Sequence, residues 1–273
     1  MGRETRVLAQ GIYFGEGPRW RHDRLWFSDF YAKAVKSVSL AGDLRSEFEI
    51  DDRPSGLGWT PDGSMLIVSM TKRQLLRRSP TGEISLHADL SGLATFHCND
   101  MVVDASGGAY VGNFGFDLDA EMEKRGAQGV IADHPTAKLA RVSPGGVVSV
   151  AAEDMHFPNG SVITPDGKTL IVGETLGGAL TAFDIGADGA LSARRVWAST
   201  LPRVPDGIAL DANGAIWIAN PIAPECARIA QGGEDGRTLF MLTAMSSIAH
   251  DAAASPSGQL LIATVDAPRA GLP

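Results

Sequence analysis

Residues 162–174, VITPDGKTLIVGE, join two short apolar runs through a tight polar turn. Asp and Gly accept the backbone angles that such turns need, and each apolar run is long enough for a short β-strand. The stretch is therefore predicted to form a β-hairpin.

The same pattern recurs along the chain. Four further copies are RWRHDRLWFSD (19–29), GWTPDGSMLIVS (58–69), VVDASGGAYVGN (102–113) and ALDANGAIWIAN (209–220). Their turns fall at Arg24, Gly63, Gly107, Gly167 and Gly214, roughly 40 to 60 residues apart. Strand-like runs between the hairpins supply two outer strands per repeat. The chain is predicted to be all-β, a single six-bladed β-propeller domain over residues 1–273 with four-stranded blades around a central channel.

The sixth blade has two candidate hairpins. EDGRTLFMLT (234–243) turns at Gly236 and resembles the hairpin at 162–174, whereas SPSGQLLIAT (255–264) turns at Gly258. We favour the first as the inner hairpin and the second as the source of an outer strand. The N-terminal run TRVLAQG (5–11) would then join this blade and close the ring. On this interpretation the chain is short by one or two strands at 231–236.

The widest interval between turns contains a polar insertion, residues 117–137. It is too long for a hairpin loop, and helical periodicity is confined to a short piece at Ala120–Arg125. We predict that this insertion forms a lid over the channel.

Polar residues recur eight positions before each turn. In a propeller this position begins the innermost strand, so the side chains should converge at one mouth of the channel. Carboxylates, carboxamides and a hydroxyl there suit Ca²⁺, Mg²⁺ or Mn²⁺, with water completing the shell. One such residue before a glycine would be an ordinary turn former, but a set at one offset favours a metal site. The five positions are Glu16, Ser55, Asn99, Asn159 and Asp206, and the 255–264 hairpin would add His250.

The second strand of each hairpin ends at the same mouth, because adjacent strands are antiparallel. Polar residues found there are Asp29, Asn113, Glu174 and Asn220, followed by Asp117 at the start of the insertion. Each could bind hydroxyl groups of a polar ligand or cap a loop, and the sequence favours neither role.

Composition limits the classes of function. The formal net charge of −8 argues against nucleic acid or an anionic membrane as partner. The start, MGRETRVLAQ, has no apolar signal-peptide region, and no apolar run approaches the roughly 18 residues of a membrane span. Cys98 and Cys226 are too few for a disulfide framework or zinc cluster. A cytoplasmic protein is predicted, without serine-hydrolase or dinucleotide-binding motifs.

Four motifs together resemble the SMP-30/gluconolactonase family, which includes regucalcin and sugar lactonases. They are GEGPRW (15–20), CNDMVVDASGGAYVGN (98–113), FPNGSVITPDGKTLIVGET (157–175) and VPDGIALDANGAIWIAN (204–220). The resemblance implies a divalent cation held by a Glu, an Asn and an Asp, which match Glu16, Asn159 and Asp206. We expect Ca²⁺, with Zn²⁺, Mn²⁺, Mg²⁺ and Fe²⁺ as alternatives.

The resemblance also implies an activity, the hydrolysis of a small sugar lactone by metal-activated water. Asp206 would be the general base, while Asn99 and, by a looser match, Asp117 would contact the substrate. His97 stands where the family usually has Arg, and we assign it to the substrate as a neutral donor. Two rival functions are calcium-dependent phosphotriester hydrolysis and a non-catalytic metal-binding propeller. The oligomeric state is left open.

Overall fold

The hairpins predicted from the sequence form the inner strands of successive sheets, as the computed structural model shows for residues 3–221, 228–246 and 249–270. The first blade contains β2 (Gly15–Arg21), β3 (Arg24–Asp29), β4 (Ala34–Ser39) and β5 (Leu44–Glu49). The second contains β6 (Pro54–Trp59), β7 (Met65–Ser69), β8 (Gln74–Arg78) and β9 (Ile84–Asp89). The third contains β10 (Cys98–Val103), β11 (Ala109–Asn113), β12 (Ala137–Val142) and β13 (Val148–Met155). The fourth contains β14 (Pro158–Ile163), β15 (Thr169–Glu174), β16 (Ala179–Ile185) and β17 (Leu191–Ser199).

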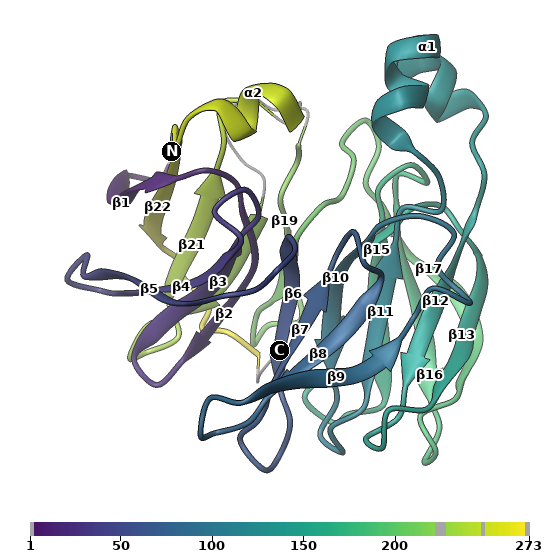
Figure 1. Ribbon diagram of the computed structural model, residues 1–273, viewed down its shortest axis with the longest axis horizontal. Coiled ribbons are helices and arrows are strands. Elements are labelled where there is room, and N and C mark those ends of the chain that lie inside the picture. The colour runs from purple at the N-terminus through teal and green to yellow at the C-terminus, as the bar shows by residue number, and fades with distance from the viewer. Residues whose placement is uncertain (1–2, 222–227, 247–248, 271–273) are drawn as a thin grey trace.

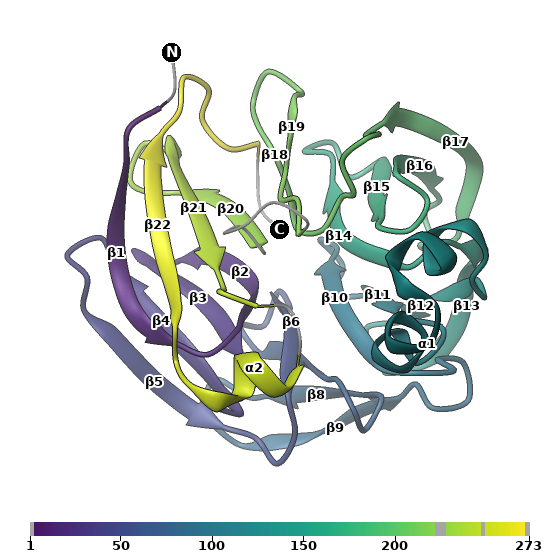
Figure 2. The ribbon, with the colours of Figure 1, turned by 90° about the horizontal axis from the view of Figure 1, so that it is seen from above.

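The remaining two blades complete the ring. Blade five has β18 (Ile208–Leu210) and β19 (Ile216–Ile218), and blade six has β20 (Arg228–Gly232), β21 (Thr238–Thr243), β22 (Gly258–Thr264) and β1 (Thr5–Ile12). Each innermost strand contacts the innermost strands of both neighbouring blades, and β20 contacts β2, so the blades surround a central axis (Figure 2). The predicted all-β, six-bladed propeller is confirmed.

Blade six is assembled as the sequence suggested. The turn at Gly236 joins β20 to β21, so 234–243 belongs to the inner hairpin. The next strand is β22, and β1 closes the sheet by pairing with β22. His250 therefore begins no inner strand: it lies exposed in a short helix, α2 (Ala249–Ala254), between β21 and β22.

The predicted position of the shortened region is wrong. Gln231 and Gly232 belong to β20, and residues 233–236 form the hairpin turn. The described part of blade five has two strands, and only nine residues separate Ile218 from Arg228 along the chain. The sequence does not reveal this arrangement, because the hairpin of blade five resembles the hairpins of the other blades. Cys226 lies outside the described residues.

Apolar side chains of adjacent sheets pack into cores between the blades. One core joins blades two and three, a second joins three and four, and a third joins six and one. In the third, Trp20 of β2 stacks on Phe240 of β21 with ring centroids 5.3 Å apart. Burial of a side chain such as Phe240 contributes about 2–3 kcal/mol, so these seams hold the ring closed.

The insertion contains a helix, α1 (Leu118–Ala132), which begins after β11. The Asp117 carboxylate caps it by accepting a hydrogen bond from the Ala120 amide at 3.1 Å, and Gly126 interrupts it with non-helical angles. Both α1 and α2 rise from the same end of the propeller (Figure 1). Because the inner strands begin at this end, the insertion lies at the mouth predicted to hold the site. Its role as a lid stays a prediction.

Candidate metal and active site

Six side chains, one from each blade, converge at the start of the innermost strands; we call them the mouth ring. Each precedes or opens an inner strand, and each is buried, with at most 7% of its surface exposed. Five are the residues predicted from the sequence, and Arg228 is the sixth. The mouth ring consists of Glu16, Ser55, Asn99, Asn159, Asp206 and Arg228.

The glycine that follows a mouth-ring residue lets neighbouring strands approach closely. A Cβ at Gly160 would lie 2.4 Å from the Asp206 carbonyl oxygen, and the Gly160 amide donates a 3.1 Å hydrogen bond to that oxygen. Only glycine permits this approach. The Asn-Gly pair of blade four therefore places Asn159 beside Asp206.

The three predicted metal ligands are brought together. Asn159 Nδ2 donates to Asp206 Oδ1 at 2.6 Å and to Thr175 Oγ1 at 3.1 Å. Glu16 and Asp206 are linked through Arg228, whose Nε contacts Glu16 Oε2 and whose Nη1 contacts Asp206 Oδ2. Residues from blades one, four, five and six thus form one connected polar cluster.

Arg228 is the functional residue that sequence reasoning missed. It lies eight positions before Gly236, the turn of the hairpin favoured for blade six, so the offset rule identifies it. The sequence interpretation favours this hairpin but names His250 of the alternative hairpin as the possible sixth position, because it considers metal-ligating side chains and not a cation.

Burial controls the charge of Glu16. Removal of its carboxyl from water raises the pKa of Glu16 to about 7, against the lowering effect of Arg228. The nearby Asp100 carboxylate raises this pKa further. The mouth ring is therefore a place where a positive charge stabilises the ionised carboxylates.

Several mouth-ring atoms are buried without a hydrogen-bond partner. They include Asn159 Oδ1, Glu16 Oε1, Ser55 Oγ and both amide atoms of Asn99. Such atoms are costly unless a ligand or water satisfies them. Glu16, Asp206 and the free Asn159 oxygen are chemically suited to a hard divalent cation. Among the described residues no three His, Cys, Asp or Glu side chains form a metal-ligating group, so a cation held here would need the Asn159 carboxamide as a third ligand.

Other predicted substrate-binding residues hold loops in place. Asn113 Nδ2 donates to the Lys138 carbonyl at 2.7 Å, and its Oδ1 accepts from the Gly115 amide at 3.0 Å. Glu174 Oε2 accepts from the His156 amide at 2.7 Å. Both side chains are buried, and substrate contact by either stays a prediction.

Asp29, Asn220 and Asp117 have similar roles. Asp29 accepts hydrogen bonds from the amides of Tyr13 and Phe14, which precede β2. Asn220 accepts from an amide just before β18, at 3.4 Å. Asp117 is exposed and caps α1. Its assignment as a substrate contact likewise stays a prediction.

His97 directly precedes β10 at the mouth of the channel and packs among aromatic side chains. Its ring is 4.0 Å from that of Phe96 and 6.1 Å from that of Phe114, measured between centroids. Partial burial, aided by the positive charge of Arg53, lowers the pKa of His97. The imidazole is therefore neutral at pH 7 and can donate one hydrogen bond, as the sequence interpretation requires.

A buried ion pair joins two of the sequence motifs that contain mouth-ring residues. Arg19 of GEGPRW donates to Asp100 Oδ1 of CND at 3.1 Å and to the Pro18 carbonyl at 2.8 Å. It links blade one to blade three across the channel, a contact that no local sequence pattern reveals. Cys98, beside this motif, is a buried thiol whose pKa burial raises to about 12, so it is no thiolate nucleophile at neutral pH.

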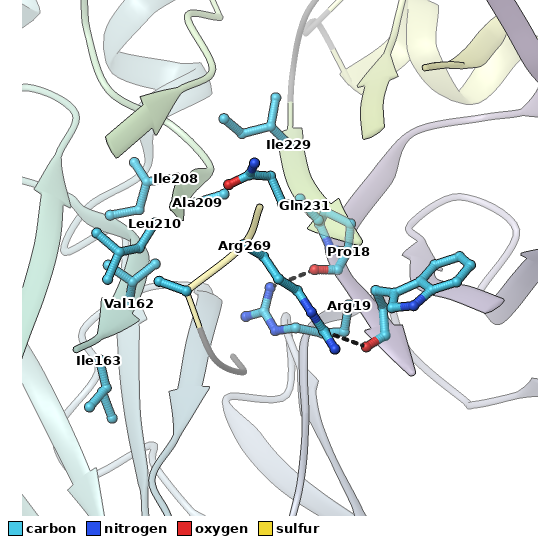
Figure 3. A pocket seen from close by; sticks show the side chains of 13 residues that line it. Pro18, Arg19, Val162, Ile163, Ile208, Ala209, Leu210, Ile229, Gln231 and Arg269 are labelled. Atoms are coloured by element: carbon cyan, nitrogen blue, oxygen red, sulfur yellow. Dashed lines mark hydrogen bonds between the residues drawn. The ribbon is translucent and has the colours of Figure 1, made fainter. Parts of the chain in front are cut away.

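A small cavity lies towards the hairpin end of the propeller. It is lined by apolar residues such as Val162 and Ile208 and by the polar side chains of Arg19 and Gln231 (Figure 3). Arg269, near the C-terminus, crosses this end and donates to the Trp20 carbonyl at 3.4 Å.

Comparison with known proteins settles the family. A family model described as the SMP-30/gluconolactonase/LRE-like region matches residues 14–265. The chain belongs to this family. Within the described residues, no helix of this family member has the length and apolar character needed to cross a membrane.

Relatives of this SMP-30/gluconolactonase-like chain include a lactonase. Pentonolactonase XacC of Haloferax volcanii is 27% identical over 79% of this chain and 69% of its own length. Protein strictosidine synthase-like 7 of Arabidopsis thaliana is 26% identical over 71% of this chain, which matches only about half, 51%, of that relative.

Solved structures of similar fold carry related names. Regucalcin of Agrobacterium tumefaciens, described as a calcium-binding protein, has a TM-score of 0.78 at 22% identity over 99% of this chain and 97% of its own. A gluconolactonase of Xanthomonas campestris has a TM-score of 0.70 at 21% identity over 99% and 90%. At these identities the likeness supports the propeller fold alone.

Proposed function

We propose that this chain is a metal-dependent hydrolase that opens the ring ester of a small lactone, of the sugar (aldono-) lactone class. The observation that carries the proposal is the cluster in which Glu16, Asn159 and Asp206 meet from three blades at one channel mouth. Membership of a family that includes lactonases supports the substrate class.

The three oxygen ligands would hold one divalent cation, with Ca²⁺ the first candidate. When bound, such an ion polarises the lactone carbonyl and lowers the pKa of a coordinated water.

Asp206 is assigned as the general base. Asn159 Nδ2 fixes Asp206 Oδ1 at 2.6 Å, which orients the carboxylate. The attacking water gives its proton to Asp206 as its oxygen bonds to the carbonyl carbon. The ring C–O bond then breaks, and the proton passes to the departing alkoxide, so the product is a hydroxy acid.

Asn99 and His97 are assigned to the substrate. Both polar atoms of the Asn99 amide are buried without a hydrogen-bond partner, so a substrate oxygen near Nδ2 would be bound there. Neutral His97 lies at the rim, where it can donate to a ring hydroxyl.

The test is a hydrolysis assay on a panel of sugar lactones beside a phosphotriester. The chain is stripped with EDTA and then supplied in turn with Ca²⁺, Mg²⁺, Mn²⁺, Zn²⁺ or Fe²⁺. We expect lactone hydrolysis that EDTA removes and one of these ions restores. Asp206→Asn should lower kcat about 10²- to 10⁴-fold, the range for loss of a general base.

Asp184→Asn is the matched control, because Asp184 is an exposed carboxylate of blade four. It should retain full activity. Hydrolysis of the phosphotriester but of no lactone would overturn the substrate class. Activity that persists in EDTA would overturn the metal requirement, and inactivity on the whole panel would favour a non-catalytic propeller.

A further inference from the structure

Arg228 completes the mouth ring as a cation built into the chain. It is the first residue of β20, pairs there with Leu242 of β21, and is 7% exposed. Its side chain is held from the other side as well: a Cβ at Gly207 would lie 3.0 Å from Arg228 Cδ. The guanidinium is thus directed at the mouth ring by backbone packing between blades five and six.

The guanidinium lies between the two acidic members of the ring. Its Nε contacts Glu16 Oε2, and its Nη1 contacts Asp206 Oδ2, with Glu16 1% and Asp206 4% exposed. Two buried carboxylates without a counter-charge are unfavourable, and one planar guanidinium satisfies both through separate nitrogens.

A divalent cation bound to both carboxylates would need the same space. Such an ion lies about 2.3–2.6 Å from its oxygen ligands. With the guanidinium already in contact with Glu16 Oε2 and Asp206 Oδ2, an ion on those oxygens would overlap it, and the two positive charges would repel. An ion that uses Glu16 Oε2 and Asp206 Oδ2 and the paired guanidinium therefore exclude each other.

We propose that Arg228 is an internal competitor for the divalent cation: the ring holds either the Arg228 guanidinium or the metal ion between Glu16 and Asp206. Binding of the ion displaces the guanidinium from both carboxylates. The apparent metal affinity equals the intrinsic affinity multiplied by the fraction of molecules in which the pair is open. This inference rests on the cation site of the proposed function, and it is independent of the identity of the substrate.

The test compares Ca²⁺ affinity by isothermal titration in the wild type, Arg228→Met and Arg228→Lys. Methionine keeps much of the apolar stem but removes the charge. We expect Ca²⁺ to bind Arg228→Met at least about tenfold more tightly, the factor for a pair that is closed nine times in ten. Arg228→Lys, which keeps a cation, should bind more weakly than Arg228→Met. Arg141→Met is the control, since Arg141 is similarly buried and pairs with Asp104 outside the ring.

A second measurement uses the wild type alone, in case Arg228→Met folds poorly. With ¹⁵N-labelled arginine, the Nε–H resonance missing from Arg228→Lys identifies Arg228, and Ca²⁺ should shift it. Equal affinities in all variants, no Ca²⁺ binding in any of them, or an Arg228 signal that ignores bound Ca²⁺ would overturn the proposal. Tighter binding in Arg228→Met without lactone hydrolysis would retain it and reject only the proposed reaction.

Discussion

Asn159 illustrates how one side chain of the mouth ring serves two partners. Its Nδ2 donates to Asp206 and Thr175, which leaves Oδ1 free to face a cation. Asn159→Ala removes this ligand and the orientation of Asp206, so Ca²⁺ affinity measured by titration should fall at least about tenfold. Circular dichroism should report an unchanged fold. Asn213→Ala, at an exposed turn of blade five, should bind Ca²⁺ like the wild type, and equal affinity in both variants would remove Asn159 from the site.

Asp52 is a residue whose charge matters for stability rather than for the site. It accepts hydrogen bonds from Ser69 Oγ at 2.7 Å and from the amides of Thr71 and Lys72 at 2.9 and 3.0 Å. Burial alone would raise the pKa of Asp52, but these hydrogen bonds outweigh it and lower the pKa below 3.8. The stabilisation is therefore complete above that value and is lost as the pH falls through the folded-state pKa.

Urea unfolding at several pH values tests this role. Asp52→Asn should lower the free energy of unfolding by about 1–3 kcal/mol at pH 7, because amide donors lose a charged acceptor. The difference from the wild type should shrink as the pH falls below 3.8 and through the lowered folded-state pKa of Asp52. Asp51→Asn, at the exposed neighbouring carboxylate, should leave stability nearly unchanged. A pH-independent difference would mean that the charge of Asp52 is irrelevant.

The sequence predicted individual residues where a local repeat marks them. Glu16, Asn159 and Asp206 could be found because each lies a fixed distance before a hairpin turn. Arg228 has the same offset, but two hairpins compete for blade six in the sequence, and an arginine does not fit a pattern of oxygen ligands. The partner of Glu174, an amide 18 residues away, depends on how a loop returns to its blade, which no short motif encodes.

At the level of elements, α1 is attached to the propeller by few contacts. Val130 is its buried residue among those described, and His134, just after the helix, links it to blade four. His134 Nε2 lies 2.9 Å from His156 Nδ1, and His134 Nδ1 lies 2.9 Å from the Val130 carbonyl oxygen. A helix that buries little surface and is linked to its blade by this histidine pair is suited to move away from the mouth and back.

His134→Ala tests whether this tether controls α1. Amide hydrogen exchange across residues 118–132 should accelerate while exchange in the inner strands stays constant. If α1 is a lid, KM for the lactone should rise more than kcat falls. His250→Ala is the control, because His250 is exposed on α2 at the same end of the molecule. Unchanged exchange in α1 would show that the histidine pair does not hold it.

Hairpins and outer strands differ in how well the sequence predicts them. The Asp–Gly turns are local: the Asp166 carboxylate accepts from the Lys168 amide at 3.1 Å, and Gly167 adopts a φ of 70°. Such turns can be read directly from the chain. Blade five, with two strands among the described residues, gives no such local signal, because its hairpin residues look like those of the four-stranded blades and only pairing in space shows which strands follow.

In the whole molecule, the two ends of the chain close the ring at different places. β1 adds the fourth strand of blade six, whereas the C-terminal segment, residues 267–270, crosses the hairpin end of blades five and six. There the amides of Ala212 and Ala270 bond with Pro268 and Leu210 carbonyls at 2.7 and 2.9 Å, and the Arg269 amide bonds with Gly236 at 2.9 Å. This segment connects blades five and six at the end opposite the mouth ring.

Truncation after Asp266 separates the stability of this connection from the chemistry of the mouth. The lost backbone hydrogen bonds, at about 1 kcal/mol each, should lower the free energy of unfolding in urea by about 3 kcal/mol. Ca²⁺ affinity measured below the unfolding transition should be retained, because the mouth ring uses no residue of the segment. A truncated chain of full stability would show that packing between the inner strands alone closes the ring. Loss of Ca²⁺ binding in a chain that is still folded would show that the two ends of the channel are coupled.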